Sequence, residues 1–591
     1  MNQGGFRVNL KKTDPNNYLP RPVGLGDDSP VERALARRTQ TLRYIIAAAA
    51  GLLWTMAFPR WNVAGFAWIA PGMMIFAGAG CTPRTRFRLG YTAGLVHTLT
   101  ALHWLLYMPV HFFPILGWLC LCLYLSLYPA AWVWLCWKLF PGEPTRAADE
   151  GRLSFRLGSE DDTRWLDRAR WALLGTIAWV AWETIQGRLF TGFPWNILGA
   201  SHSSMVLLTQ ISAFTGVSGV SFLIVWGSLS LWLTFSEIAK TPANRFVWQR
   251  ELALPLTAVF LVAAYGWNQL HQIKKADQLL KVALIQPSIP QTMIWDENAS
   301  SQRLAKLFSM SREALKAKPD LLVWPEAALP YPIRYDADLY QGLTQLITNT
   351  STWFLFGSDD AAITPITAPV PATNYFNSAF LLNPSGHFVG TYAKRQLVIF
   401  GEYVPLVKWL PFLRWFTPIS GGFTPGEERV SFELRDRGVR FSPLICFEDM
   451  FARVVRDQSQ EDVQFLVNIT NDGWFGESAQ QWQHTTSASF RAIENGIPLI
   501  RCSNNGITCW VDPQGRIWNT DFESGASVYG EGTKHLTVPL YVTTPSSWTF
   551  YRKFGDVFGW GCTAVAAAVG LPVWIRSRHL RSGSAPPSVS I

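Results

Sequence analysis

Long apolar runs alternate with short polar loops over the first half of the chain. A helix needs roughly 20 apolar residues to cross about 30 Å of hydrocarbon. Windows of that length predict seven spans before residue 275 and one near the end, at about 44–58, 62–80, 89–109, 113–137, 169–187, 207–236, 252–269 and 556–575. The pattern therefore predicts a multi-span membrane protein.

Between residues 276 and 550 the pattern changes to short apolar strands, polar helices and Gly/Pro turns. Strands are predicted within 281–290, 321–324, 352–360, 377–386, 439–449, 463–476 and 497–517. Helices are predicted over about 299–317 and 483–496, and hairpin turns in LLNPSG and VDPQG. Buried strands with interleaved helices are typical of an α/β sandwich. The fold class is thus α/β plus membrane α-helical.

These patterns divide the chain into five parts. They are a basic tail, a seven-helix bundle containing a charged insert, an α/β domain, a final helix and a short tail, at 1–43, 44–275 (insert 141–170), 276–550, 551–576 and 577–591. The insert is predicted to be a flexible cytoplasmic loop. The first 43 residues are too polar for a signal peptide, so the first span is predicted to be an uncleaved anchor.

Composition and charge agree with a membrane protein. Charged residues make up only 16% of the chain, against about 25% in soluble proteins, and the 29 tryptophans favour bilayer interfaces. Lys and Arg concentrate in the N-terminal tail, in the second, fourth and sixth loops and in the C-terminal tail, while the other loops hold only Arg60 and Arg188. The positive-inside rule then predicts eight spans, both ends cytoplasmic and residues 276–550 on the outer face.

The eight cysteines show no zinc-type spacing and no CxxC pair, so we expect no metal site. Cys502 and Cys509 could pair on an oxidising outer face, whereas Cys446 must stay free if it is a nucleophile. No Walker or dinucleotide-binding loop occurs, so we expect no cofactor. No nucleic-acid partner is expected, and nothing in the sequence indicates an oligomer, so a monomer is predicted.

Three short segments each place one ionisable residue in an apolar or turn-rich frame. They are LLVWPEAALP with Glu326, TYAKRQLVIFGEYVP with Lys394 and SPLICFEDM with Cys446. A thiol near neutral pH needs a base or a positive neighbour to act as a nucleophile. Glu326 can serve as the base, and Lys394 can lower the thiol pKa and stabilise an oxyanion. The three types together predict acyl transfer through a thioester.

Each residue alone has a simpler explanation. A Glu at a strand end is usually a solvated turn residue, a Lys in a loop is usually on the surface, and a Cys between Ile445 and Phe447 is usually core. His484 offers an alternative Cys–His pair, but with Glu326 and Lys394 present it is expected to support packing or a hydrogen bond near the site. The occurrence of all three segments in one order favours the catalytic interpretation.

The motifs WPEAALP, YAKRQLVIFGEYVP, PLICFED and NITNDGWFG resemble the nitrilase superfamily over about 280–545. The whole layout resembles, more closely, the apolipoprotein N-acyltransferases of bacterial envelopes, as do RLFTGFPWNILG (188–199) and YRKFGD (551–556). The resemblance covers nearly the whole chain apart from both tails and the insert. It implies eight transmembrane helices carrying an outer-face αββα sandwich with a Glu-Lys-Cys triad.

Carried over residue by residue, the resemblance makes Glu326 the general base, Lys394 the oxyanion-stabilising residue and Cys446 the nucleophile. It makes supporting residues of three further positions, which are Glu402, Glu448 and Asn377. It also places Trp295 and Trp474 on loops that gate lipid access. Phe447 departs from the family, which often has Tyr directly after the nucleophile, so a hydroxyl is missing there.

The resemblance implies a two-step activity in the inner membrane of a bacterium, with the catalytic domain on the periplasmic face. An acyl chain passes from a phospholipid to the Cys thioester, and then to the α-amino group of the S-diacylglyceryl cysteine of a lipoprotein. The main alternative is a membrane-anchored nitrilase-type amide hydrolase, in which water replaces the amine. A non-enzymatic lipoprotein-binding protein and a transporter are further alternatives.

Overall fold

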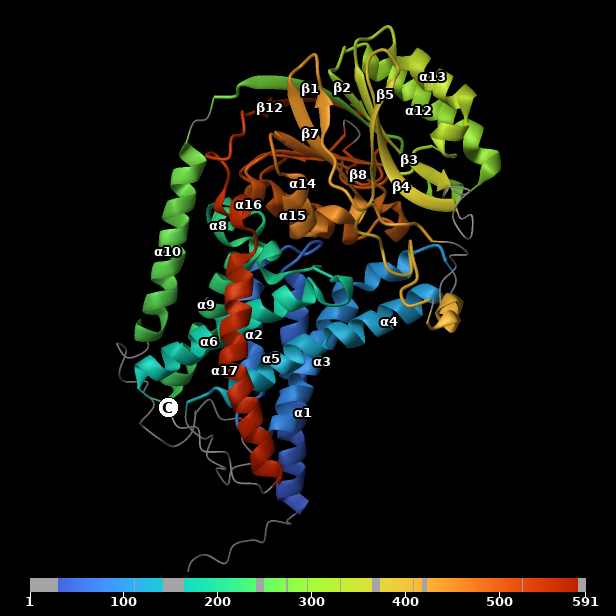
Figure 1. The fold of residues 1–591 in the computed structure, drawn as a ribbon. Helices are drawn as coiled ribbons and strands as arrows, with labels where there is room; N and C mark the ends of the chain where they lie inside the picture. Colours follow the sequence, from blue (N-terminus) through green and yellow to red (C-terminus); the bar gives the residue numbers. More distant parts are fainter. Residues whose placement is uncertain are drawn as a thin grey trace, which may run out of the picture.

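The computed structural model describes residues 30–582, apart from residues 111, 142–163, 241–248, 273–274, 295, 330, 364–372, 408, 417–421 and 523–524. Trp295, most of the predicted insert and the outer parts of both predicted tails (1–29 and 583–591) therefore lie outside the described residues, whereas residues 30–43 and 577–582 are helical. Figure 1 shows two parts, a bundle of helices and, at one end of it, a domain built on two sheets. We call this second part the sandwich domain (276–549).

The bundle consists of long helices with several short ones at the sandwich end (Figure 1). Its longer helices are α1 (Pro30–Met56), α3 (Pro83–Ala101), α4 (Phe113–Leu125), α5 (Leu127–Lys138), α6 (Trp165–Gln186), α9 (Val217–Lys240), α10 (Gln249–His271) and α17 (Val557–Ser582). Its short helices are α2 (Ala70–Ala77), α7 (Val206–Thr209), α8 (Ser212–Thr215) and α16 (Phe550–Phe554).

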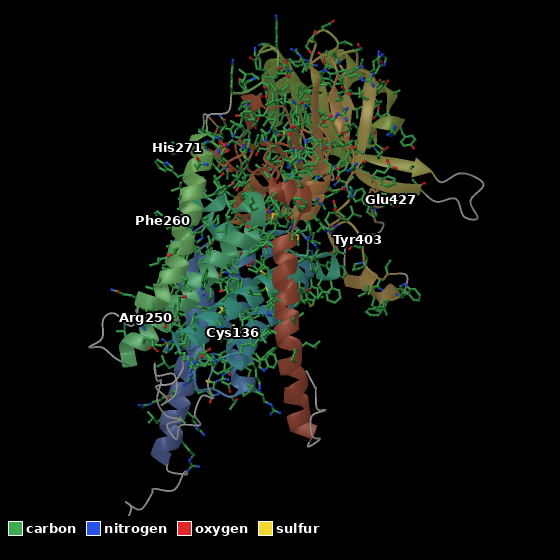
Figure 2. All side chains as sticks on the ribbon, turned by 60° about the vertical axis from the view of Figure 1, so that its left-hand side comes forward. Cys136, Arg250, Phe260, His271, Tyr403 and Glu427 are labelled. Atoms are coloured by element: carbon green, nitrogen blue, oxygen red, sulfur yellow. The ribbon has the colours of Figure 1, made fainter. Side chains whose placement is uncertain are left out.

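Small residues bring the bundle helices close together. A Cβ added at Gly51 of α1 would lie 2.3 Å from the Ala93 carbonyl oxygen of α3. Gly94 of α3 similarly faces Pro129 of α5, at 2.4 Å. Close backbone approach at small residues is the usual way in which membrane helices pack, because lipid supplies no hydrophobic drive between them. The outer side of α10 instead carries exposed apolar side chains such as Phe260, which points away from the bundle (Figure 2).

Three stretches of the described chain are both long and apolar enough to cross a membrane: Phe113–Lys138, Val217–Ala239 and Gln249–His271. The count of eight spans therefore stays a proposal. Two predicted spans differ from the structure. Residues 62–80 form a 3₁₀ turn and the eight-residue α2, and the span predicted from residue 207 begins at Val217, because Gly216 has a positive φ of 65° and interrupts the helix.

The sandwich domain contains two six-stranded sheets. The order in the first sheet is β12-β1-β2-β3-β4-β5, and in the second it is β11-β10-β9-β8-β7-β6. The strands are β1 (Gln278–Gln286), β2 (Leu321–Val323), β3 (Trp353–Ile363), β4 (Thr373–Leu382), β5 (Phe388–Ala393), β6 (Phe432–Leu434), β7 (Val439–Ile445), β8 (Phe465–Thr470), β9 (Leu499–Ser503), β10 (Cys509–Val511), β11 (Ile517–Trp518) and β12 (Gly532–Leu540).

Successive residues of a strand point to opposite faces, and here both faces are buried. On β1, Val282 and Leu284 pack between the two sheets, while Ala283 and Ile285 pack under α12 (Ser300–Leu315) and α13 (Ala337–Ile347). The second sheet is covered on its outer face by α14 (Ala452–Gln458) and α15 (Gln480–Asn495). The layers are therefore helix, sheet, sheet, helix, which confirms the predicted αββα sandwich.

Helix α15 lies between the second sheet and the bundle (Figure 1). Ala488 and Ala492 of α15 share one apolar cluster with Leu466 of β8 and with Trp104 and Trp195 of the bundle. The Gln483 side chain accepts hydrogen bonds from both of these indoles, at 3.1 and 2.8 Å, and donates to the carbonyl of Pro59 at 3.0 Å. The two parts of the molecule thus share a continuous core.

The open possibility of a disulfide between Cys502 and Cys509 is not realised. Both cysteines are free and buried. Cys509 of β10 lies opposite Arg501 rather than Cys502, and the Cys502 thiol donates to the carbonyls of Ile285 and Val323. The sheet register therefore directs the two thiols to different surroundings.

Candidate active site

Glu326 lies on a tight turn directly after the central strand β2. Ala327 has a positive φ of 50°, and a Cβ added at Gly357 of β3 would lie 2.8 Å from the Glu326 Cα. The turn therefore has room only because residue 357 is a glycine. The Glu326 carboxylate, 7% exposed, accepts from Lys394 at 3.2 Å, from Asn377 at 2.8 Å and from the backbone N–H of Asn471 at 3.0 Å. These three donors fix its orientation.

Lys394 follows β5 and is 1% exposed. Its ammonium group donates to Glu326 and, at 2.8 Å, to Glu402. Burial alone would lower the pKa of Lys394, but the two carboxylates hold this pKa well above its ordinary value. The side chain is thus a buried ammonium ion shared by two carboxylates.

Asn377 and Glu402 complete this cluster. The Asn377 amide on β4 donates to Glu326 and, at 3.1 Å, to Glu402. Glu402 also accepts from the backbone N–H of Val398, at 2.9 Å. The cluster therefore contains two carboxyl groups and one lysine. Four residues that were predicted for one site, Glu326, Lys394, Glu402 and Asn377, are therefore joined by direct hydrogen bonds.

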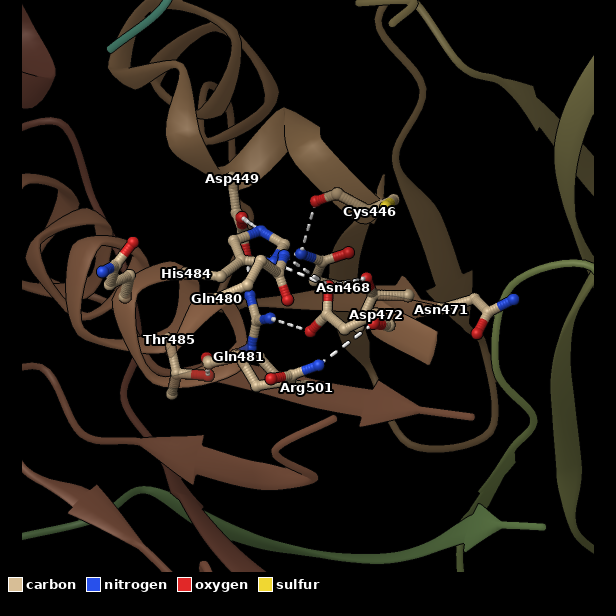
Figure 3. Close-up of polar contacts among 12 residues, drawn as sticks. Cys446, Asp449, Asn468, Asn471, Asp472, Gln480, Gln481, His484, Thr485 and Arg501 are labelled. Atoms are coloured by element: carbon tan, nitrogen blue, oxygen red, sulfur yellow. Dashed lines mark hydrogen bonds and ion pairs between the residues drawn. The ribbon is translucent and has the colours of Figure 1, made fainter. Parts of the chain in front are cut away.

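Cys446 lies at a sharp strand-to-turn junction. It is the first residue after β7, opens the 3₁₀ turn η8 (Cys446–Met450) and has a positive φ of 53°. Asn468 of β8 donates to its carbonyl oxygen at 3.0 Å. The thiol points away from His484 (Figure 3), so the structure contains no Cys446–His484 pair.

The charges of Glu326 and Lys394 both act on the Cys446 thiol. Burial raises its pKa, Glu326 raises it further, and Lys394 opposes both. The expectation that Lys394 lowers the thiol pKa has the right sign, but burial and the charge of Glu326 outweigh it. The thiol is protonated at neutral pH, so attack by sulfur requires a neighbouring base to accept the proton.

Glu448 links the lysine segment to the cysteine segment. It is fully buried, and burial raises the pKa of its carboxyl above the ordinary value. It accepts from the backbone N–H groups of Arg395, Gln396 and Ile445 at 2.7, 3.1 and 2.8 Å, and from the Tyr392 hydroxyl at 2.9 Å. Because these donors flank Lys394 and Cys446, Glu448 fixes the position of one relative to the other.

A second charged cluster lies behind Cys446 and was missed by the sequence reasoning, apart from a hydrogen-bonding role for His484. The His484 ring contacts Asp449 at 2.6 Å and Asp472 at 2.9 Å through its two nitrogens, and Arg501 pairs with Asp449 (Figure 3). All four side chains are at most 1% exposed. The signal in the sequence was Arg501 itself, an unaccompanied charge inside the apolar strand IPLIRC.

Trp474 and Phe447 belong to turns that contact the bundle. Trp474 is partly exposed on the 3₁₀ turn η9 (Asp472–Phe475), whose Phe475 packs against Trp104 of the bundle at 4.8 Å between ring centroids. Phe447 packs against Phe193 and Trp195 of the bundle, at 6.2 and 6.1 Å. In the part of the chain that the structure describes, no group of three or more His, Cys, Asp or Glu side chains could hold a metal ion.

Comparisons with known proteins agree with both parts of this architecture. Residues 281–529 match the carbon-nitrogen hydrolase family, and residues 50–230 match the apolipoprotein N-acyltransferase N-terminal domain. An apolipoprotein N-acyltransferase of Geobacter metallireducens is 33% identical over 89% of this chain and 94% of its own length. That of Haemophilus influenzae is 33% identical over 58% of this chain and 65% of its own length.

Among solved structures, a mutant of a nitrilase-superfamily amidase from Nesterenkonia aligns with 45% of this chain and 93% of its own, at 17% identity and a TM-score of 0.34. A nitrilase-superfamily protein from Saccharomyces cerevisiae aligns with 45% of this chain and 92% of its own, at 19% identity and a TM-score of 0.32. The sequence matches, by contrast, extend over the bundle as well.

The fold and the family match together define a carbon–nitrogen hydrolase domain joined to a helical membrane bundle. One relative, moreover, matches this chain almost from end to end. The chain belongs to the apolipoprotein N-acyltransferase family.

Proposed function

We propose that this protein transfers an acyl chain from a membrane phospholipid to the α-amino group of the S-diacylglyceryl cysteine of lipoproteins. The observation that carries the proposal is the match to the Geobacter metallireducens enzyme over both the bundle and the sandwich domain. The geometry supports it, because the charges of the Glu326 carboxylate and of the buried Lys394 ammonium, which contact each other, both act on the Cys446 thiol.

In the first half-reaction, Glu326 accepts the proton of Cys446, and the sulfur attacks the ester carbonyl of the phospholipid. Lys394 stabilises the oxyanion of the tetrahedral intermediate. This intermediate collapses to a thioester, and the departing alkoxide takes the proton from Glu326 and leaves as a lysophospholipid. Covalent catalysis divides one difficult aminolysis into two easier steps.

In the second half-reaction, the free α-amine attacks the thioester and gives up a proton to Glu326. The Cys446 thiolate leaves and is reprotonated from Glu326, which restores the resting enzyme and yields the amide. The proposed scheme is thus ping-pong, with Glu326 acting twice in opposite directions. Glu402, Asn377 and Glu448 hold the reacting groups in place and need not touch the substrate.

Both substrates are lipids, so we place the site at the membrane surface. The proposed arrangement has eight spans, both ends in the cytoplasm and the sandwich domain on the periplasmic face of the inner membrane of a bacterium, in a monomer. The Lys and Arg asymmetry between alternate loops supports it. A compartment-sensitive reporter after residue 420 should then be active only outside the cytoplasm, and one after residue 155 only inside.

Trp474 and Trp295 are proposed to gate lipid entry. The loop that carries Trp474 contacts the bundle, because Phe475 packs against Trp104 and Gly476, at a positive φ of 56°, lies next to Tyr107. Replacing Trp474 with Ala should therefore weaken thioester formation with long acyl chains more than with a short soluble ester. The alternative, an amide hydrolase, has no comparable support from the sequence matches.

Intact-mass measurement of the purified protein with phospholipid tests the chemistry. The wild type should gain the mass of one acyl chain, and Cys446→Ala should gain none. Cys120→Ser is the matched control, since Cys120 is exposed and lies in α4 of the bundle, and it should acylate normally. An adduct that persists in Cys446→Ala, or steady release of free fatty acid without an amine acceptor, would contradict the proposal.

A further inference from the structure

A groove lined by three arginines lies where the last helix of the bundle meets the sandwich domain. Its volume is about 560 Å³, and its charged lining comprises Arg188, Arg453, Arg456 and Asp556. Arg188 follows α6, the two other arginines belong to α14, and Asp556 directly precedes α17. We call this feature the arginine groove. None of these residues takes part in the site around Cys446.

The three arginines of the groove outnumber its one carboxylate, Asp556, on which the charge of Arg188 acts. Arg456 donates to the carbonyl oxygens of Arg552 and Lys553, at 2.9 and 2.6 Å, and so meets no carboxylate there. Arg453 donates to the amide oxygen of Gln396. The structure gives the Arg188 guanidinium no hydrogen bond or ion pair with any described residue. Asp556 is the single acidic group among the described residues of the lining.

The arginines of the groove lie close enough for their charges to repel one another. Burial lowers the pKa of Arg453, and the positive charges of Arg188 and Arg395 lower it further. Arg395 itself pairs with Asp457 at 2.8 Å, so it brings its own counter-charge. Like charges held together around a cavity favour an anion, and guanidinium groups bind phosphate in a planar, often bidentate fashion.

The rest of the lining is apolar and open to the surroundings. Phe554, Val557 and Trp560 line the groove and are 59, 52 and 49% exposed. Below them, Gly561 has open space where its Cβ would be, and Ala564 and Ala568 continue the same exposed face of α17. The groove thus combines a cluster of arginines, exposed aromatic side chains and an adjoining apolar helix face. A lipid, which has a charged group and an acyl chain, fits this combination better than a free ion does.

We infer that the arginine groove binds an anionic glycerophospholipid of the phosphatidylglycerol class. Its phosphodiester would sit among Arg188, Arg453 and Arg456, and one acyl chain would lie along the exposed face of α17. This lipid is a bound component of the protein rather than the acyl donor. The inference does not depend on the proposed function, because lipid retention is measured without turnover.

Native mass spectrometry of the delipidated full-length protein in detergent tests the inference. Added dioleoylphosphatidylglycerol should be retained, with dioleoylphosphatidylcholine retained at least about fivefold more weakly. The double variant Arg188→Gln/Arg453→Gln should weaken retention of phosphatidylglycerol at least about tenfold, since each basic group near an anionic lipid contributes about a fivefold effect. Arg188→Lys/Arg453→Lys should keep part of it. Arg435→Gln, an exposed position in the turn after β6, is the matched control and should bind as the wild type does.

A second measurement on the unaltered protein guards against a folding defect in the variants. Retention of phosphatidylglycerol by the wild type should fall when sodium chloride rises from about 0.05 to about 0.5 M, because salt screens exposed charges. Inorganic phosphate at millimolar concentration should not displace the lipid, because it has no chain to place on α17. Equal retention of the two lipids, equal retention by the Gln variants, or displacement by phosphate alone would each overturn the inference.

Discussion

At the scale of single residues, the region around Cys446 is dominated by negative charge. Glu326 and Glu402 share one Lys394, and Asp359, which pairs across the strands with Asn377, lies close enough for both carboxylates to act on it. The three motifs predicted Glu326, Lys394 and Cys446, because each motif has a strong local signature. The position of Asp359 beside these carboxylates could not be predicted, since it results from the pairing of β3 with β4.

Asp359→Asn tests this charge balance through pH. Burial, with help from Glu326 and Glu402, raises the pKa of Asp359 to about 6 from an ordinary value of 3.8. A carboxyl whose folded pKa is raised keeps its proton longer in the folded state, so its ionisation costs stability as pH rises from about 4 to 6, and the cost remains above that. The variant should therefore gain up to about 1 kcal/mol more over the wild type at pH 8 than at pH 5.

Thermal unfolding at both pH values measures this difference. Asp360→Asn is the control, because Asp360 pairs with Arg334 at 2.9 Å and its loss should bring no gain as pH rises. If the stability difference between Asp359→Asn and the wild type were the same at pH 5 and pH 8, the carboxyl would not be held protonated by its surroundings.

His484→Gln tests the buried charge cluster behind the nucleophile. Both ring nitrogens contact carboxylates, so glutamine, which donates from one atom only, leaves Asp449 or Asp472 with one contact fewer. Removing one member of a buried charged set typically costs about 3–5 kcal/mol. We expect a clear drop in melting temperature and slower thioester formation, because Asn468 connects Asp449 to the Cys446 carbonyl. His535→Gln, exposed on β12, should change neither quantity.

At the scale of elements, the apolar runs predicted most of the strands, because strands buried on both faces are continuously apolar. The hairpins at LLNPSG and VDPQG were correct and join β4 to β5 and β10 to β11. Strand β5 was implied only by the LLNPSG hairpin, and two further strands, β6 and β12, were missed. The first has three residues, and the second is recognisable only through its antiparallel pairing with β1, more than 240 residues earlier in the chain. Local pattern cannot reveal such a partner.

Gly357→Ala tests how β3 positions Glu326. The new Cβ would lie 2.8 Å from the Glu326 Cα and from the Pro325 carbonyl oxygen, and both belong to backbone that cannot swing aside. The turn must shift, so we expect kcat to fall at least about tenfold, as misplacing a reacting group by a fraction of an ångström commonly does. Gly342→Ala in α13 meets only the end of the Phe308 ring, at 3.4 Å, and should stay fully active. Normal turnover by Gly357→Ala would show that the turn tolerates displacement.

At the scale of the whole molecule, the sandwich domain and the bundle form one packed unit. The sequence predicted two parts of different class, yet it gave no sign that α15 lies between them, because α15 reads as a polar helix. Its polar residues are instead buried and matched to partners in both directions. Gln483 is the clearest case, since its amide contacts Trp104 and Trp195 on one side and Pro59 on the other.

Gln483→Leu should therefore loosen the joint between the two parts. Leucine has a similar volume but leaves two buried indole N–H groups without an acceptor, and each unsatisfied buried donor costs about 1–3 kcal/mol. Large membrane proteins often unfold irreversibly, so the expected result is a shorter half-life at elevated temperature in detergent, with increased proteolysis between the bundle and β1. Gln483→Glu keeps the acceptor and loses the donor, and should fall between Leu and the wild type. Gln345→Leu, exposed on α13, should behave as the wild type does. If Gln483→Leu were as long-lived as that control, the joint would depend on apolar packing alone.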